Sequence, residues 1–363
     1  MSPKILHLIA AARPNFMKVA PLYHALARES WCAARIVHTG QHYDVTMSDA
    51  FFRDLQLPEP AYHLGVGSGS HAEQTGRTMI AYEGVCQAGP PDAIVVVGDV
   101  NATAACAMVG AKLWIPVVHL EAGLRSRDRR MPEEINRLVT DAISDLLWTP
   151  SPDADANLIA EGIPPAKIEC IGNIMIDSFE MLRSKIDASD SRQRLGLTGP
   201  FAVVTLHRPS NVDDRASLTE LAHTLVQLSA ELTVVFAVHP RTRKRLEEFA
   251  LLSALAAAPA VRVTEPLSYI EFMNLITGCT IAITDSGGVQ EETTYLGVPC
   301  VTLRENTERP ITVTEGTNRL LKPPDLLAAV REALAGRWPR GRRPALWDGH
   351  AAQRAALSLR RRI

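Results

Sequence analysis

Short runs of Val, Ile and Leu recur along the whole chain and alternate with longer segments of helix-forming residues. Runs such as 93–98 and 201–206 are apolar at nearly every position, which is typical of strands buried on both faces of a parallel sheet. The segments between the runs are long enough to be crossover helices, because a parallel connection needs about a dozen residues. The pattern therefore predicts an α/β fold of doubly wound parallel sheets covered by helices.

The runs also predict where the elements lie. We expect strands at 4–11, 34–38, 93–98, 115–119, 145–149, 168–171, 201–206, 232–238, 260–263, 280–284 and 299–303. Crossover helices are expected at 14–29, 101–112, 133–146, 216–230 and 289–296. The chain has 363 residues, which is too long for one domain of roughly 100–200 residues. We therefore expect two Rossmann-like domains, 1–173 and 174–363, that face each other across a cleft. The last helix is expected to pack back on the N-terminal domain.

Charge and composition exclude several classes of protein. Lys and Arg number 38 against 40 Asp and Glu, a net charge of −2, so a general nucleic-acid binder is not expected. The arginine-rich segments 337–343 and 360–362 are expected to be solvated. No apolar run approaches the roughly 20 residues that span a bilayer, and the first residues show no secretory pattern. We therefore expect a cytoplasmic protein without a membrane segment.

The six cysteines are scattered, and none has the spacing of a zinc site. We interpret them as small buried hydrophobic residues in a reducing compartment. The glycine cluster at 65–69 does not complete G-x-G-x-x-G, and no Walker pattern is present, so a dinucleotide fingerprint is absent. The sequence thus indicates neither a metal nor a dinucleotide cofactor.

Two cations flank the start of the first predicted helix. Arg13 precedes Pro14 and Lys18 follows within the first turns. Because the exposed N–H groups of a helix N-terminus already favour negative charge, such cations suit an anion site. Two ordinary surface cations are the alternative, and both interpretations stay open.

Three acids lie where predicted strands end or a helix begins. Asp99 follows strand 93–98, Glu121 follows strand 115–119, and Glu133 comes directly after Pro132. Singly, each has a structural explanation, such as a helix N-cap for Asp99 or a favourable first-turn position for Glu133. Together at one cleft, grouped carboxylates raise each other's pKa values and can supply both an acid and a base.

In the second half, His207 and Arg208 end strand 201–206, and His239 ends strand 232–238. An Arg fork beside a tunable His suits a phosphate group, although a structural histidine is the competing view.

The segment from Thr284 to Glu292 follows an apolar strand and opens a helix. Ser286, Gly287 and Gly288 would let the backbone approach a ligand and aim N–H groups at phosphate. Glu292, one turn into the helix, could reach ribose hydroxyls. Arg309 adds a cation in a later loop. These residues predict a nucleotide site in the second domain.

Nine short motifs follow one another along the chain in an order that is typical of one enzyme family. They are Arg13-Pro14, Thr39-Gly-Gln-His-Tyr-Asp44, Gly98-Asp99, His119-Leu-Glu-Ala-Gly-Leu-Arg125, Pro132-Glu-Glu, His207-Arg208, His239-Pro240, Asp285-Ser-Gly-Gly-Val-Gln-Glu-Glu292 and Thr307-Glu-Arg-Pro310. The chain resembles the non-hydrolysing UDP-N-acetylglucosamine 2-epimerases over nearly its whole length, from residue 4 to residue 349.

The resemblance implies a glycosyltransferase-B-like fold with the nucleotide in the interdomain cleft. It implies reversible conversion of UDP-N-acetylglucosamine (UDP-GlcNAc) to UDP-N-acetylmannosamine (UDP-ManNAc). UDP would be eliminated to give a 2-acetamidoglucal and then added back, without a cofactor and without a metal. A homodimer, activation by a second UDP-GlcNAc and a place in polysaccharide biosynthesis are further family expectations.

The resemblance also implies roles for individual residues. The catalytic residues would be Asp99, Glu121, Glu133 and His207. The UDP-binding residues would be Arg13, Lys18, Phe272, Ser286, Gly287, Gly288, Glu292 and Arg309. The residues that hold the activating UDP-GlcNAc would be Gln41, His42, Arg208 and His239. Which acid takes the proton and which returns it does not follow from the sequence.

Some positions depart from the family pattern. Well-known members have Glu after Arg-Pro, whereas this chain has Asn15, and Pro209-Ser210 stands where they often have Arg-Glu. The sugar therefore stays open, and a UDP-diacetamido-uronic acid or another UDP-sugar is an alternative substrate. A retaining glycosyltransferase, a hydrolysing epimerase and a catalytically silent sugar-nucleotide binding protein are the rival functions.

Overall fold

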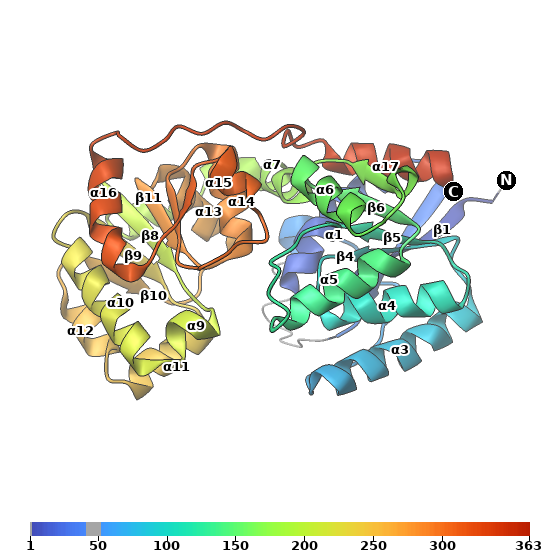
Figure 1. The fold of residues 1–363 in the computed structure, drawn as a ribbon, viewed down its shortest axis with the longest axis horizontal. Helices are drawn as coiled ribbons and strands as arrows, with labels where there is room; N and C mark the ends of the chain where they lie inside the picture. Colours follow the sequence, from blue (N-terminus) through green and yellow to red (C-terminus); the bar gives the residue numbers. More distant parts are fainter. Residues whose placement is uncertain (1, 41–51) are drawn as a thin grey trace. The chain divides into compact units, whose positions relative to one another are not determined.

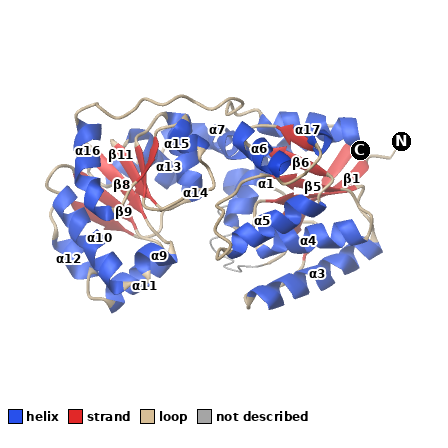
Figure 2. Ribbon diagram, in the orientation of Figure 1, coloured by secondary structure: helices blue, strands red, loops and turns tan. Residues whose placement is uncertain are grey.

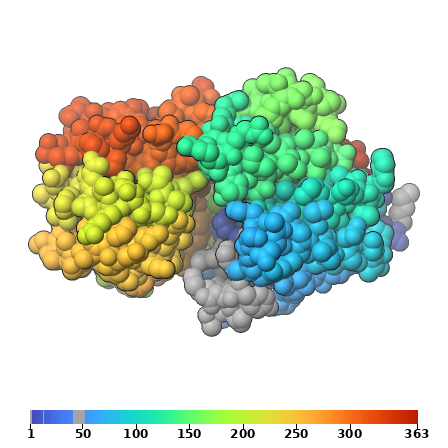
Figure 3. Space-filling view, turned by 60° about the horizontal axis from the view of Figure 1, so that its bottom comes forward, coloured from blue at the N-terminus to red at the C-terminus, as the bar shows by residue number. Residues whose placement is uncertain are grey.

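The computed structural model describes residues 2–40 and 52–363, and the chain divides into two compact units (Figure 1). Unit 1 comprises Met1–Met181 and Ala345–Ile363, and unit 2 comprises Leu182–Pro344. In each unit helices lie on both faces of a parallel sheet (Figure 2). The surface of unit 2 in Figure 3 comes from one continuous stretch of the chain, coloured from yellow-green to red-orange. The predicted fold class, two parallel-sheet α/β domains, is confirmed.

The sheet of unit 1 has the strand order β3-β2-β1-β4-β5-β6-β7 within the described residues, and all its pairings are parallel. Its strands are β1 (Lys4–Ala10), β2 (Cys32–His38), β3 (Tyr62–His63), β4 (Ala93–Val97), β5 (Val117–Leu120), β6 (Leu146–Thr149) and β7 (Ile168–Cys170). Its helices are α1 (Arg13–Leu26), α3 (His71–Ala88), α4 (Asn101–Lys112), α5 (Pro132–Ile143), α6 (Pro152–Ala160), the short η1 (Pro165–Lys167) and α17 (Ala351–Arg362).

The sheet of unit 2 repeats this topology with the order β10-β9-β8-β11-β12-β13, again all parallel. Its strands are β8 (Phe201–Thr205), β9 (Thr233–Ala237), β10 (Val261–Thr264), β11 (Ile281–Thr284), β12 (Cys300–Thr302) and β13 (Asn318–Leu320). Its helices are α8 (Ser191–Arg194), α9 (Pro209–Val212), α10 (Arg215–Leu228), α11 (Pro240–Glu248), α12 (Leu252–Ala257), α13 (Tyr269–Gly278), α14 (Gly287–Leu296), α15 (Ile311–Thr314), η2 (Pro323–Asp325) and α16 (Leu326–Leu334).

The central strands are buried as their composition predicts. All five residues of β4 are buried, and β8 is buried at its first four positions. Because helices cover both faces, neither face of these strands needs polar residues. Four cysteines are buried, while Cys170 and Cys279 are partly exposed, and all six are free. None of the described helices is long and apolar enough to cross a membrane.

The division between the units falls after Met181 rather than after residue 173, because α7 (Ile174–Asp187) is one continuous helix that begins in unit 1. Ser178 on this helix donates a hydrogen bond to the carbonyl oxygen of Met17. Residues 345–363 are part of unit 1 rather than of the second domain, and α17 packs against α1 (Figure 1).

Side chains explain why the last residues belong to unit 1. Asp177 accepts hydrogen bonds from the backbone N–H groups of Ala351 (3.1 Å) and Ala352 (2.7 Å) and so caps α17. The indole N–H of Trp347 donates to the carbonyl of Pro150 at 2.9 Å. The segment 345–350 is thereby held against the first part of the chain.

Replacing Gly172 by alanine is expected to lower the free energy of unfolding by about 2 kcal/mol or more. Gly172 has φ +87°, and a Cβ there would lie 2.1 Å from the carbonyl oxygen of Leu346. The left-handed backbone alone costs roughly 1–2 kcal/mol for a residue with a side chain, and overpacking adds to it. Urea unfolding followed by circular dichroism measures the loss.

Gly162 is a matched control for this substitution. It has the same φ of +87°, but a Cβ added there would meet no atom within 4 Å. Gly162→Ala should therefore show the backbone cost without the clash. Equal losses for the two alanine variants would contradict the close approach of Leu346 to Gly172.

Candidate active site

The carboxyl edge of the unit 1 sheet carries three of the predicted residues. β1 and β4 are neighbours in the sheet. The chain adds β2 and β3 on the side of β1, and it adds β5, β6 and β7 on the side of β4. Ligands of doubly wound sheets bind at such a switch point, beyond the carboxyl ends of the strands. Lys18 lies on α1 after β1, Asp99 lies after β4, and Glu121 lies after β5. The topology therefore brings these three residues to one edge, whereas the sequence grouped Asp99 and Glu121 with Glu133.

Glu121 forms an ion pair with Lys18, and their side chains are only 9% and 11% exposed. Glu121 has φ +74°, which is rare for a residue with a long side chain. Two backbone hydrogen bonds to the carbonyl of Trp148 hold this conformation, from Glu121 at 3.1 Å and from Ala122 at 2.9 Å. Strained backbone of this kind is concentrated at functional sites.

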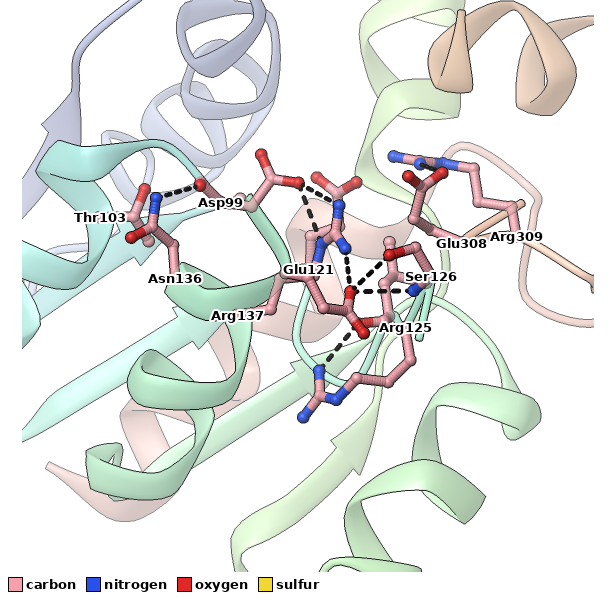
Figure 4. A network of polar contacts seen from close by, with 12 residues as sticks. Asp99, Thr103, Glu121, Arg125, Ser126, Asn136, Arg137, Glu308 and Arg309 are labelled. Atoms are coloured by element: carbon pink, nitrogen blue, oxygen red, sulfur yellow. Dashed lines mark hydrogen bonds and ion pairs between the residues drawn. The ribbon is translucent and has the colours of Figure 1, made fainter. Parts of the chain in front are cut away.

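Asp99 is not the N-cap of the following helix, because that position belongs to Val100. Its Oδ2 instead accepts hydrogen bonds from Nε (3.0 Å) and Nη2 (2.8 Å) of Arg137. The side-chain amide of Asn136 donates to the Asp99 carbonyl oxygen at 2.9 Å. Figure 4 shows both neighbours turned toward Asp99 from α5. The Asp99 side chain stays 34% exposed, so it is held in place and still reachable.

Glu133 is not part of this network. It lies partly exposed in the first turn of α5, and no hydrogen bond or ion pair of Glu133 is found within the described residues. The next residue, Glu134, is buried and pairs with Arg137. Arg137, which contacts Asp99, was not among the predicted residues. A sequence signal existed, because Arg137 stands three residues after Glu134 and so beside it on the helix surface.

A buried polar cluster supports the loop that carries Glu121. Asp141 contacts the ring of His119 at 2.6 Å and the guanidinium of Arg125 at 2.7 Å, and it accepts from the Gly123 N–H at 3.1 Å. Burial raises the pKa of Asp141, but His119 and Arg125 outweigh that effect and leave the pKa below its usual value. Through Gly123 and Arg125, the cluster holds the loop after β5 in place.

Unit 2 repeats the arrangement at the switch point between β8 and β11. Asp285, fully buried, accepts from the backbone N–H groups of His207 (3.1 Å) and Arg208 (2.8 Å) and from the amide of Asn211 (3.0 Å). Burial raises the pKa of Asp285, but the bonds from His207 and Asn211 leave it lowered. The His207 ring, 3.1 Å from Asp285 through Nδ1, remains about one-third exposed. Asp285 thus orients the His207 ring, because a partner that holds Nδ1 also fixes the direction in which Nε2 points.

His239 lies beside this histidine, with ring centroids 5.4 Å apart. Its Nδ1 accepts from the Arg241 N–H at 3.2 Å, which caps α11. Burial and the neighbouring His207 lower the pKa of His239, although Asp285 opposes the shift. His207 and His239, to which the sequence gave different roles, therefore lie side by side.

The start of α14 combines a helix N-terminus with a cation. Ser286 is the N-cap residue, and its side chain makes no capping bond, so the first N–H groups of the helix are not used by that side chain. A Cβ on Gly287 would lie 2.6 Å from Nη1 of Arg309, whereas Gly288 faces open space. Glycine at 287 is what lets the guanidinium lie against the helix start. This pairing suits a diphosphate.

Arg309 belongs to a larger group of charges. It pairs with Glu291 at 2.9 Å, and Glu308, which is also near Arg309, is bound by both terminal nitrogens of Arg304 at 2.7 and 2.8 Å (Figure 4 shows Glu308 and Arg309). Arg208 is 3.7 Å from Glu308. Glu308 and Glu291 were not predicted from the sequence, although both stand in the quoted motifs. They hold the arginines in place.

Glu292 lies buried on α14 and accepts a hydrogen bond from the Tyr269 hydroxyl at 2.7 Å. Burial raises the pKa of Glu292 to about 8, and Glu291 adds to the rise, while the Tyr269 bond opposes it. Phe272, half-buried, stands one turn after Tyr269 on α13. These residues of α13 and α14 form the region where the sequence predicted the nucleoside.

The raised pKa of Glu292 predicts that this residue makes the folded state less stable as the pH rises. At a pH between 4.5, its ordinary pKa, and about 8, the Glu292 carboxyl is ionised in the unfolded chain and protonated in the folded chain. The unfolded state then binds fewer protons, so the free energy of unfolding falls as the pH rises through this range. Glu292→Gln should match the wild type near pH 5 and unfold at a higher urea concentration than the wild type at pH 8. A difference between the two proteins that stays constant from pH 5 to 8 would contradict this.

Three predicted residues cannot be placed. Gln41 and His42 lie outside the described residues, and so does the side chain of Arg13, whose backbone begins α1. Within residues 2–40 and 52–363, no group of three or more His, Cys, Asp or Glu side chains could hold a metal ion.

Asn15, where the chain departs from the family pattern, has a structural role. Its side chain is buried, accepts from the Ala12 N–H at 3.0 Å and donates to the Val97 carbonyl at 3.0 Å. It therefore ties the start of α1 to the end of β4, beside Lys18.

Comparison with known proteins finds relatives along most of the chain. A family model described as UDP-N-acetylglucosamine 2-epimerase matches residues 24–360. The chain is 42% identical over 325 residues to the UDP-N-acetylglucosamine 2-epimerase of Methanocaldococcus jannaschii, covering 87% of this chain and 88% of the relative. It is 40% identical over 323 residues to the UDP-2,3-diacetamido-2,3-dideoxy-D-glucuronate 2-epimerase of Pseudomonas aeruginosa, covering 88% of both chains.

Solved structures extend the likeness to the fold. The crystal structure of the Methanocaldococcus jannaschii UDP-GlcNAc 2-epimerase in complex with UDP-GlcNAc and UDP superimposes with a TM-score of 0.89 at 39% identity. The match covers 98% of this chain and 99% of that one. The similarity therefore includes both sheets and their carboxyl edges.

Proposed function

The chain belongs to the UDP-N-acetylglucosamine 2-epimerase family, and from that premise we propose that it interconverts UDP-GlcNAc and UDP-ManNAc. The reaction inverts the configuration at C2 of the sugar. The single observation that carries the proposal is the pair of acids at the carboxyl edge of unit 1, Asp99 and Glu121, each held by a cation. Carboxylates fixed in this way can exchange a proton with a substrate carbon.

The route is elimination followed by addition. The C2 proton of the sugar is too weakly acidic for simple abstraction, so breaking the C1–O bond to UDP must help to remove it. A base takes the C2 proton, UDP leaves with the bonding electrons, and a C1–C2 double bond forms in a 2-acetamidoglucal. Addition of UDP to C1 and of a proton to the other face of C2 gives the epimer. No oxidant is consumed, so no redox cofactor is needed.

We assign the two halves of this chemistry to different residues. Asp99, Glu121 and Glu133 are candidates to carry the proton. The helix start at Ser286, Gly287 and Gly288, with Arg309, offers donors to the departing diphosphate. Lys18 balances the charge of Glu121, and His207, held by Asp285, is a further proton carrier. Glu292 and Phe272 are candidates to hold the nucleoside.

Product analysis tests the function. Incubation with UDP-GlcNAc should give UDP-ManNAc, identified by its own anomeric proton signal in the NMR spectrum, and UDP-ManNAc should return UDP-GlcNAc. Release of free N-acetylmannosamine and UDP would indicate a hydrolysing enzyme. Transfer that requires an acceptor would indicate a glycosyltransferase. Binding without any conversion would indicate a silent sugar-nucleotide binding protein.

A second substrate has support from one relative. The Pseudomonas aeruginosa enzyme named for UDP-2,3-diacetamido-2,3-dideoxy-D-glucuronate is almost as similar to this chain as the UDP-GlcNAc enzyme of Methanocaldococcus jannaschii. The two sugars differ at C3 and C6, away from the reacting carbons. A panel with both UDP-sugars decides between them by kcat/KM, and the higher value identifies the substrate.

The remaining family expectations are proposals as well. We propose a cytoplasmic homodimer that serves polysaccharide biosynthesis and binds a second, activating UDP-GlcNAc at Gln41, His42, Arg208 and His239. The closeness of His239 to His207 supports a link between the two nucleotide positions. Conversion of UDP-ManNAc that accelerates when a trace of UDP-GlcNAc is added would support activation. Sedimentation gives the oligomeric state.

A further inference from the structure

Glu134 is a buried carboxylate on the first turn of α5 that has no part in the proposed proton transfer. Its Oε2 accepts from the backbone N–H of Ser126 (2.9 Å) and from the Ser126 hydroxyl (3.0 Å), and its Oε1 accepts from the backbone N–H of Arg127 (2.8 Å). Glu134 is 2% exposed. It therefore fastens the loop that follows β5 to the start of α5.

The same carboxylate holds Arg137, one turn further along α5. Nη1 of Arg137 donates to Glu134, while Nε and Nη2 donate to Oδ2 of Asp99 at 3.0 and 2.8 Å. The Arg137 side chain is 4% exposed. Figure 4 shows the Arg137 guanidinium between Asp99 and Ser126. Glu134, Arg137 and Asp99 thus form one chain of charge-assisted bonds.

The number of donors explains why a carboxylate is needed at position 134. Two backbone N–H groups, one hydroxyl and one guanidinium N–H all point at Glu134. An ionised carboxylate is an acceptor at both oxygens, whereas a glutamine has one oxygen and turns an NH₂ group toward the other donors. A glutamine would therefore leave buried donors unsatisfied, which displaces whichever of them can move. Of these donors, the Arg137 guanidinium is the one that also binds Asp99, so we expect its displacement to reach Asp99.

The neighbouring glutamate does not share this role. Successive residues of an α-helix point about 100° apart, so Glu133 and Glu134 cannot both face the network. Glu134 turns into it, and Glu133 stays partly exposed. The two glutamates of one motif therefore have different functions.

We propose that Glu134 is a positioning residue, which orients the Arg137 guanidinium and through it the Asp99 carboxylate for the reaction at C2. The inference rests on the proposed function, because it gives Asp99 a proton to carry. Glu134 touches no reacting atom. Its effect on Asp99 passes through Arg137.

The first experiment compares Glu134→Gln with Glu161→Gln. Glu161 also pairs with a buried arginine of unit 1, Arg125, at 2.8 and 2.6 Å, but it has no link to Asp99. We expect Glu134→Gln to lower kcat by about 10- to 100-fold, since a misplacement of about 1 Å can cost that much. KM should change by less than about threefold, and the Glu161→Gln control should keep kcat within about threefold of the wild type.

A double-variant cycle tests whether the effect passes through Arg137. Arg137→Lys keeps the charge but cannot bridge both carboxylates, so it should lower kcat as Glu134→Gln does. Adding Glu134→Gln to Arg137→Lys should then lower kcat little further. Independent effects that multiply in the double variant would overturn the proposal. If Glu134→Gln does not fold, Arg137→Lys alone decides, because wild-type kcat in that variant also overturns the proposal.

A second readout needs no substrate. The Nε–H resonance of Arg137, assigned by its absence from Arg137→Lys, should shift in Glu134→Gln and in Asp99→Asn, but not in Glu161→Gln. An unchanged resonance in Glu134→Gln overturns the positioning role even if no UDP-sugar is converted. Failure of the wild type on every UDP-sugar counts instead against the proposed function, so the two failures are distinguishable.

Discussion

Asp99→Asn and Glu121→Gln are each expected to lower kcat by about 10²- to 10⁴-fold, the range that a proton-transferring side chain typically contributes. Both changes keep the size of the side chain and remove its ability to take up and release a proton. Neither acid is among the UDP-binding residues that the resemblance implies, most of which lie in unit 2. UDP affinity should therefore stay near the wild-type value, and isothermal titration with UDP measures it.

Asp92 provides a control at the other end of the same strand. It directly precedes β4, where it accepts from the Ile5 N–H at 2.8 Å, while Asp99 follows the strand. Asp92→Asn should keep kcat within about threefold of the wild type. Wild-type turnover in both Asp99→Asn and Glu121→Gln would remove these acids from the mechanism. Loss of UDP binding together with turnover would show that the substitutions disturb the fold instead.

Asp141→Ala is expected to lower the free energy of unfolding by roughly 3–5 kcal/mol, the usual cost of removing one partner from a buried ion pair. Asp141 is 1% exposed and holds His119, Arg125 and the Gly123 N–H. Its removal leaves the buried Arg125 charge with one counter-ion, Glu161, among the residues that the structure describes. Urea unfolding followed by circular dichroism gives the change.

Asp128→Ala is the matched control, since Asp128 is an aspartate of the same unit whose ion pair with Arg130 lies at the surface. Exposed pairs contribute little because water screens them. The control should unfold at nearly the same urea concentration as the wild type. An Asp141→Ala protein as stable as the Asp128→Ala protein would show that the buried cluster does not support the loop after β5.

The strand pattern was predictable because burial on both faces leaves a continuous apolar run. β4, with all five residues buried, shows this most clearly. The edge strands β3 (Tyr-His) and β13 (Asn-Arg-Leu) were not predicted, because their polar residues leave no apolar run. The equally short strands β7 and β12 were predicted, because each lies in a mostly apolar run. Helix α3 was also not expected, although the capping box formed by Ser70 and Glu73 marks its start.

The position of the candidate acids was predictable from topology, but their partners were not. Asp99 and Glu121 follow the carboxyl ends of the parallel neighbours β4 and β5, so they lie at one edge of the sheet for any loop conformation. The choice between Glu133 and Glu134 depends instead on how the loop before α5 turns, and Arg127 in that loop has a left-handed φ of +59°. No hydrophobic period encodes that turn. The same holds for Glu308, whose contacts with Arg304 and Arg208 arise only in the folded loop.

The most direct test of the central claim is the fate of the hydrogen at C2 when UDP-GlcNAc is incubated with the enzyme in D₂O. Elimination and re-addition predict one solvent deuterium at C2 in the recovered UDP-ManNAc and, after prolonged incubation, in UDP-GlcNAc as well. The C2 proton signal should disappear from the NMR spectrum, while the signals of the other carbon-bound protons stay. An epimer that retains protium at C2 would contradict proton exchange with the carboxylates.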